Sequence, residues 1–164
     1  MWAFALTPHY FPHNEDGSPP LAIRTGMMAI GMIPFIFAMA LKFNPISLLT
    51  GIPHSHMLLY HQVAAIVLLF LSIVHTVPFV WQALREEGYE RLKYIWSDSY
   101  SIYWSGTVAI FFLLWIVVSS LGIFRWLSYE FFVVQHVISF TILLACLFVH
   151  VQDLLNAHVW LWVT

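Results

Sequence analysis

Charged side chains and cysteine are scarce in this 164-residue sequence. Charged residues make up 9% of it and apolar residues 61%. Soluble domains carry about a quarter charged residues, so this chain cannot cover its surface with groups that water solvates. The net charge of −2 argues against a nucleic-acid partner. The single cysteine, Cys146, excludes an internal disulfide and a metal site built from several thiolates. These absences indicate an integral membrane protein.

The few charges lie in clusters and leave four uncharged, apolar stretches. A membrane helix needs about 20 apolar residues, so each stretch is read as one span. The four stretches are residues 25–41, 57–82, 99–124 and 131–152. Between the first two lies a segment with asparagine, glycine, two prolines and two histidines, which breaks the apolar run.

The two ends of the sequence differ from these stretches. Residues 1–20 are too polar for a span and are read as a leading extramembrane loop. The apolar residues after Asp153 are read as the start of a fifth span. The expected fold class is therefore all-α, a polytopic membrane helix bundle in residues 21–164 with four full spans plus the start of a fifth.

Two of the expected spans carry a histidine at each end of an apolar run. His61 and His75 bracket HQVAAIVLLFLSIVH, and His136 and His150 bracket HVISFTILLACLFVH. In an α-helix such a separation of 14 positions rises about 21 Å and returns nearly to the same face. One span lies between the two helices, so they run in the same direction. We therefore expect His61 at the depth of His136, and His75 at the depth of His150.

Facing imidazoles from neighbouring helices are the two axial ligands of a six-coordinate haem. The sequence thus predicts two stacked b-type haems, with His61 and His136 on one iron and His75 and His150 on the other. One alternative is that the histidines only pack helices together through hydrogen bonds. Zinc or copper is a less suitable metal for these histidines, because no cysteine or carboxylate lies at the same depth in the membrane. No catalytic side chain is predicted, and the remaining histidines (9, 13, 54, 56 and 158) are expected at or beyond the membrane interfaces.

Nearly all of residues 17–164 resembles a known family. The two histidine-bracketed helices, the segment GSPPLAIRTGMMAIGMIPFIFAMALKFNPISLLTGI and the stretch YEFFVVQH are similar to the ferric reductase transmembrane domain of fungal ferric-chelate reductases. That family is related to NADPH oxidases. The resemblance implies a dihaem cytochrome b core that passes electrons across the membrane to a ferric chelate, for iron uptake. It also implies that His61 and His136 ligate the inner, cytoplasmic-side haem, and His75 and His150 the outer one.

Full-length members of the family also bind FAD and NADPH, in domains for which this sequence has no motif. It contains no HPF[ST]-like flavin motif and no GxGxxG loop. The expected electron donor is therefore a flavoprotein dehydrogenase domain or subunit, and the chain is not expected to be active alone. The family commonly has His-Arg-Trp where this sequence has His61-Gln62-Val63, which leaves Arg125 and Arg24 as candidate partners of haem propionates. The resemblance implies the plasma membrane, with the vacuolar membrane as the alternative.

Several alternatives stay open at this stage. Oxygen is a second candidate acceptor, as in an NADPH oxidase, and a non-catalytic membrane fragment without haem is a third reading. A transporter is disfavoured because no carboxylate or lysine lies within a span.

Charge and family resemblance predict opposite orientations of the chain in the membrane. The positive-inside rule favours a cytoplasmic location for the side that holds Arg24, Arg85, Arg91 and Lys93. The resemblance implies the reverse, and we adopt the latter.

Overall fold

The computed structural model describes residues 20–86, 88–97 and 102–151, and all regular structure in these ranges is α-helical. The helices are α2 (Pro20–Ala40), α3 (Pro45–Thr50), α4 (His54–Glu86), α5 (Gly88–Ser97), α6 (Ile102–Ser119), α7 (Gly122–Leu127) and α8 (Tyr129–His150). Four of these described helices, α2, α4, α6 and α8, are long and apolar enough to cross a membrane. The expected all-α class with four spans is thereby confirmed. The predicted leading loop and the start of a fifth span lie outside the described residues.

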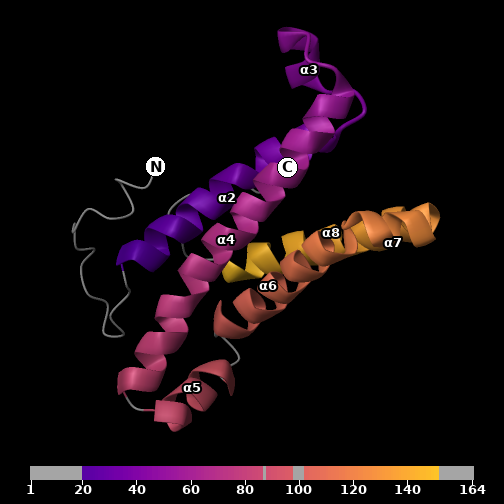
Figure 1. Ribbon diagram of the computed structural model, residues 1–164. Helices are drawn as coiled ribbons and strands as arrows, with labels where there is room; N and C mark the ends of the chain where they lie inside the picture. Colours follow the sequence, from indigo (N-terminus) through magenta and orange to yellow (C-terminus); the bar gives the residue numbers. More distant parts are fainter. Residues whose placement is uncertain (1–19, 87, 98–101, 152–164) are drawn as a thin grey trace.

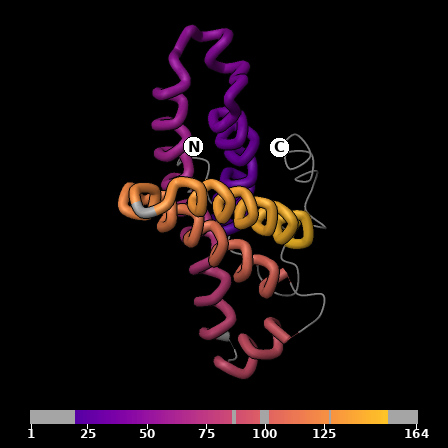
Figure 2. The backbone as a smooth tube through the Cα atoms, turned by 90° about the vertical axis from the view of Figure 1, so that its right-hand side faces the viewer, coloured from indigo at the N-terminus to yellow at the C-terminus, as the bar shows by residue number. Residues whose placement is uncertain are grey.

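The four long helices form two pairs. Helix α2 packs along α4, and α6 packs along α8 (Figure 1). The two pairs cross, as the tube view shows from the side (Figure 2). Contacts between α4 and α6 join the pairs, and α5 lies against both of these helices. Each pair thus contains one of the two helices that carry a pair of histidines.

An apolar core lies where the helices meet, and the outer faces are apolar as well. The core is formed by side chains from all four long helices, among them Ile33, Leu68, Leu71, Leu113, Ile116 and Leu143. Large apolar side chains also point outward, and Ile66 and Val137 are each 59% exposed. An outward apolar face suits contact with lipid. In lipid, helices associate mainly through close packing rather than through the hydrophobic effect.

Helix α3 divides the apolar stretch that begins in α2 from the one in α4. Asn44 caps its start, because the side-chain oxygen accepts hydrogen bonds from the N–H groups of Ile46 (2.9 Å) and Ser47 (3.3 Å). Gly51 ends it with φ of 72°, a left-handed conformation that glycine adopts without steric cost. These two residues turn the chain between α2 and α4, so that the two helices run side by side.

Two further short helices lie between the spans, α5 in the charged segment and α7 partly inside the third predicted span (99–124), because the membrane-length helix α6 ends at Ser119. Helix α5 begins at Gly88, whose φ of 74° permits the sharp turn after α4. Helix α7 precedes α8, and Ser128 between them caps α8 by accepting a hydrogen bond from the N–H of Phe131. The charge pattern located these connections but contained no period long enough to show their helices.

Packing at Leu71 is expected to contribute measurably to stability. This side chain is 1% exposed in the core, so Leu71→Ala leaves a cavity and should lower the free energy of unfolding by about 2–5 kcal/mol. Ile73, two residues along the same helix, is 43% exposed, and Ile73→Ala should change stability little. Thermal denaturation of both variants in detergent checks the difference. Equal midpoints would show that Leu71 is not in a packed core.

Candidate functional site

The structure brings the four bracketing histidines together in two pairs. The imidazole centroids of His61 on α4 and His136 on α8 are 6.4 Å apart, with an interplanar angle of 52°. Those of His75 and His150, on the same two helices, are 5.9 Å apart, with an interplanar angle of 87°. We call these the His61–His136 pair and the His75–His150 pair. Each helix therefore contributes one imidazole to each of two levels.

Three of the four imidazoles donate a hydrogen bond to a backbone carbonyl of a neighbouring helix. The Nδ1 atom of His61 lies 2.8 Å from the Ile36 carbonyl oxygen on α2. On the other level, Nδ1 of His75 lies 2.7 Å from the Ala22 oxygen, and Nδ1 of His150 lies 2.8 Å from the Ile102 oxygen. A carbonyl oxygen can only accept, so Nδ1 carries the proton and Nε2 of the neutral ring keeps a free lone pair.

The fourth imidazole, His136, has a side-chain partner instead. Its Nδ1 lies 3.4 Å from the Ser120 hydroxyl oxygen. That hydroxyl also lies 2.6 Å from the Ile116 carbonyl oxygen, to which it donates its own proton. Ser120 therefore accepts from the imidazole and links it to the backbone of α6. The tautomer is the same as in the other three rings, with Nε2 left as the ligand atom.

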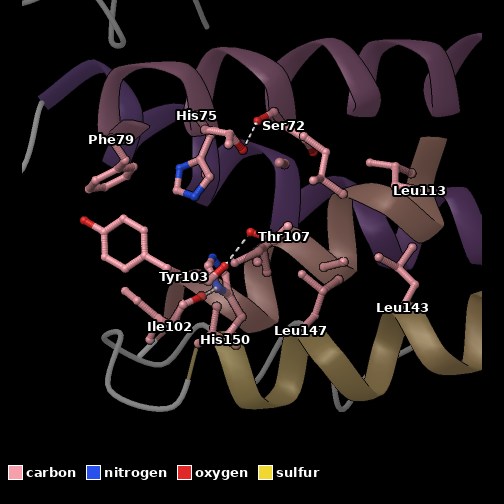
Figure 3. Close-up of a pocket in the computed structure, with 18 of the residues that line it drawn as sticks. Ser72, His75, Phe79, Ile102, Tyr103, Thr107, Leu113, Leu143, Leu147 and His150 are labelled. Carbon is pink, nitrogen blue, oxygen red and sulfur yellow. Dashed lines mark hydrogen bonds between the residues drawn. The ribbon is translucent and has the colours of Figure 1, made fainter. Parts of the chain in front are cut away.

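A pocket of about 150 Å³ adjoins the His75–His150 pair. Figure 3 shows the two imidazoles entering it from opposite sides, His75 from α4 and His150 from α8, with Phe79 and Tyr103 at one end. The wall is otherwise mainly aliphatic. Its aromatic end is extended by Trp96 of α5, whose indole N–H donates to the Thr107 hydroxyl over 3.0 Å. Helix α5 thus contributes to the closure of this level of the bundle.

The remaining candidate ligands do not join these pairs. No three His, Cys, Asp or Glu side chains cluster as a metal site within the described ranges. Cys146 is half-buried on α8 and is a free thiol. Arg24 is buried on α2, and Arg125 is half-buried on α7. What the two arginines bind stays a prediction.

The sequence predicted the four histidines but not the groups that accept hydrogen bonds from them. Three of these groups are backbone carbonyls, which every residue has and which therefore leave no mark in a sequence. Ser120 is a side-chain partner, but serine at the end of an apolar span is common and has many local uses. A serine 16 positions before a histidine is not a recognised signal.

A second polar contact that the sequence did not predict joins α6 to α8 next to the His61–His136 pair. The Gln135 side chain donates to the Ser119 hydroxyl over 2.9 Å and accepts from the Trp115 indole N–H over 2.8 Å. Such contacts hold transmembrane helices in a fixed rotation relative to each other. Because Gln135 precedes His136, this contact also fixes the direction in which that imidazole points.

Comparison with known proteins identifies relatives of the whole chain. The family described as the ferric reductase like transmembrane component matches residues 25–147. The chain is 41% identical over its full length to the ferric/cupric reductase transmembrane component 7 of Saccharomyces cerevisiae, of which it covers 26%. It is 37% identical, again over its full length, to a protein of Aspergillus oryzae named a probable cell surface ferric reductase, of which it covers 22%. The chain thus spans about a quarter of the length of these relatives. No solved structure matches it.

The Gln135 contact is expected to stabilise the α6–α8 pair. Replacing it in Gln135→Leu removes both hydrogen bonds while keeping the size of the side chain, and should cost about 0.6–1.7 kcal/mol of stability. Thr141 on the same helix is the matched control, because its hydroxyl bonds only to the Val137 carbonyl one turn earlier. Thermal denaturation in detergent should show a lower midpoint for Gln135→Leu than for Thr141→Val. The opposite order would contradict this role.

Proposed function

Because the chain belongs to the family of ferric-reductase-like transmembrane components, we propose that it forms a haem-bearing membrane core that carries electrons across a bilayer to a metal acceptor. Two haems would be held, one between His61 and His136 and one between His75 and His150. The observation that carries the proposal is that both imidazole pairs face each other with Nδ1 already occupied by a hydrogen bond.

The spacing of the imidazoles supports this ligand role. With a metal–nitrogen bond of about 2 Å and about 1 Å from each nitrogen to its ring centre, two imidazoles that share one metal have centres about 6 Å apart. The centroids lie 6.4 Å and 5.9 Å apart in the two pairs. Packing alone does not demand this separation twice, on the same two helices.

The hydrogen bonds at Nδ1 support the same role. Metal-bound histidines almost always donate their second N–H to a carbonyl, a carboxylate or water, which fixes the ring orientation and raises the basicity of the ligand nitrogen. Here His61, His75 and His150 donate to carbonyls and His136 to a hydroxyl. With Nδ1 engaged in this way, Nε2 is the nitrogen of each ring that is available to a metal.

The pocket beside the His75–His150 pair supports a cofactor with a large apolar surface, because its wall is mainly aliphatic and aromatic. Its volume of about 150 Å³ is below the 300–1,000 Å³ usual for such sites. Accommodating a porphyrin therefore requires some lining side chains to change rotamer. Phe79 and Tyr103, which close one end, are the side chains best placed to do so.

Bound haem would supply a one-electron couple between ferric and ferrous iron. The protein supplies the axial nitrogens, the apolar surroundings and the alignment of two sites across the membrane. We propose a flavoprotein domain or subunit as the donor on the His61–His136 side, which would be cytoplasmic. A ferric or cupric complex is the proposed acceptor, because relatives are named ferric/cupric and ferric reductases. The relative named a cell surface reductase favours the plasma membrane.

The first test is a reduced-minus-oxidised absorbance spectrum of the chain, purified in detergent after expression with ample haem. We expect a low-spin b-type spectrum with close to two haems per chain. A flat spectrum at full helical content would refute the proposal and leave the histidines as packing residues.

Substitution of single histidines assigns the two haems. His61→Ala and His136→Ala should each lower the haem content from two to about one, because either change removes an axial ligand from the same iron. His75→Ala and His150→Ala should each remove the other haem. The control is His56→Ala, an exposed histidine on α4 outside both pairs. Haem content and absorbance measure the outcome, and loss of both haems in every variant would indicate collapse of the bundle instead.

A further inference from the structure

Two glycines lie directly against the imidazoles of the His75–His150 pair. Gly26 of α2 faces the ring of His75, and Gly106 of α6 faces the ring of His150. A Cβ atom at position 26 would lie 2.6 Å from Nδ1 and 2.8 Å from Cε1 of His75. At position 106 it would lie 2.7 Å from Cε1 and 3.0 Å from Nδ1 of His150. Side-chain atoms essentially never approach this closely, so any other residue would displace the ring.

Each glycine lies one helical turn after the carbonyl that its imidazole contacts. His75 donates to Ala22, four positions before Gly26, and His150 donates to Ile102, four positions before Gly106. Residues four apart lie on the same face of a helix. We call the carbonyl and the bare glycine backbone together a seat, in which the Nδ1–Cε1 edge of the ring lies against the helix and Nδ1 reaches the oxygen.

The two seats share one more feature, which is a buried hydroxyl group on the residue before each glycine. The Thr25 hydroxyl donates within α2 to the carbonyls of Leu21 (2.8 Å) and Ala22 (3.0 Å). The Ser105 hydroxyl donates to the Ile102 carbonyl (2.9 Å). In both seats the oxygen that receives the imidazole also receives a hydroxyl, and the hydroxyl itself is buried.

The two seats are equivalent positions of an internal repeat. Moving 80 positions along the chain takes the α2 seat onto the α6 seat, so that Ala22, Thr25 and Gly26 match Ile102, Ser105 and Gly106. The same shift takes four buried residues onto buried residues, in the pairs Thr25–Ser105, Ala29–Ala109, Ile33–Leu113 and Ile36–Ile116. The histidines repeat with a shift of 75, from α4 to α8. The helix pairs α2–α4 and α6–α8 are thus built alike, each from one helix that carries two histidines and one helix that contacts them.

We propose that Gly26 and Gly106 are positioning residues of the His75–His150 haem site. Small residues let helices approach closely in membranes, and here the missing side chain lets an imidazole, rather than a second backbone, approach. The seat orients Nε2 toward the partner ring. This inference rests on the proposed function, because the orientation matters only if Nε2 is a ligand.

The test compares Gly26→Ala and Gly106→Ala with the wild type in detergent after haem loading. Each change should remove the same haem, or shift its midpoint potential, while the haem of the His61–His136 pair keeps its spectrum and potential. The matched controls are Gly31→Ala on α2 and Gly122→Ala on α7, where an added Cβ meets nothing within 4 Å. Both controls should retain two haems. A wild type without haem would refute the proposed function, whereas unchanged spectra and potentials in both glycine variants would overturn this inference alone.

A second measurement covers the case in which the glycine variants lose both haems. Thermal midpoints of the haem-free protein are compared for Gly26→Ala in the wild type and in a His75→Ala background. If Gly26 is needed to make room for the imidazole, the added methyl group lowers the thermal midpoint only when His75 is present. The effects of Gly26→Ala and His75→Ala are then strongly non-additive. An equal drop in both backgrounds would mean that Gly26 only permits helix packing, and would overturn the proposal.

Discussion

The arrangement depends on one constraint, which is that a polar group inside a bilayer must find its partner within the protein. Each of the four imidazoles meets it by giving its Nδ1 proton to a group on a neighbouring helix, a carbonyl in three cases and the Ser120 hydroxyl in the fourth. These bonds link α4 to α2 and α8 to α6. The same contacts therefore pair the helices, turn the rings and select the tautomer.

Those bonds explain why the bundle is built from two similar pairs of helices. The ligand-bearing helices α4 and α8 expose long apolar faces, and their polar contacts are made to α2 and α6. Neither α2 nor α6 contributes an imidazole to the two pairs. Helix α2 supplies a carbonyl at each level, whereas α6 supplies the Ile102 carbonyl at one level and is followed by Ser120, whose hydroxyl serves the other. One helix of each pair thus carries the ligands and the other holds them. The two levels differ in detail, because His136 contacts only a serine hydroxyl, whereas His150 contacts the Ile102 carbonyl at 2.8 Å and the Ser105 hydroxyl at 3.5 Å.

The sequence predicted the features that depend on the spacing of side chains, but not the contacts that are made by backbone atoms. Charge-free stretches predicted four membrane helices, and the 14-residue separation placed His61 and His75 on one face. Two groups of contacts could not be predicted from the sequence. A carbonyl acceptor such as that of Ala22 has no sequence signature. The closeness of Gly26 to His75 follows from the rotation of α2 against α4, which is set by packing and not by either helix alone. The short helices α3 and α7 were missed because six residues make fewer than two helical turns. Helix α5 has 10 residues and was missed because its segment was read only for its charges.

The hydroxyl groups along the pocket wall have a consequence for protons. Ser72, Thr76 and Thr107 donate to carbonyls of their own helices, over 2.9, 2.8 and 2.8 Å. The protons of these three hydroxyls are therefore engaged in hydrogen bonds within their own helices. On the proposed function, an electron that reached this level would therefore arrive without a proton from these three hydroxyls, and their fixed dipoles would be part of the surroundings that set the reduction potential of the site.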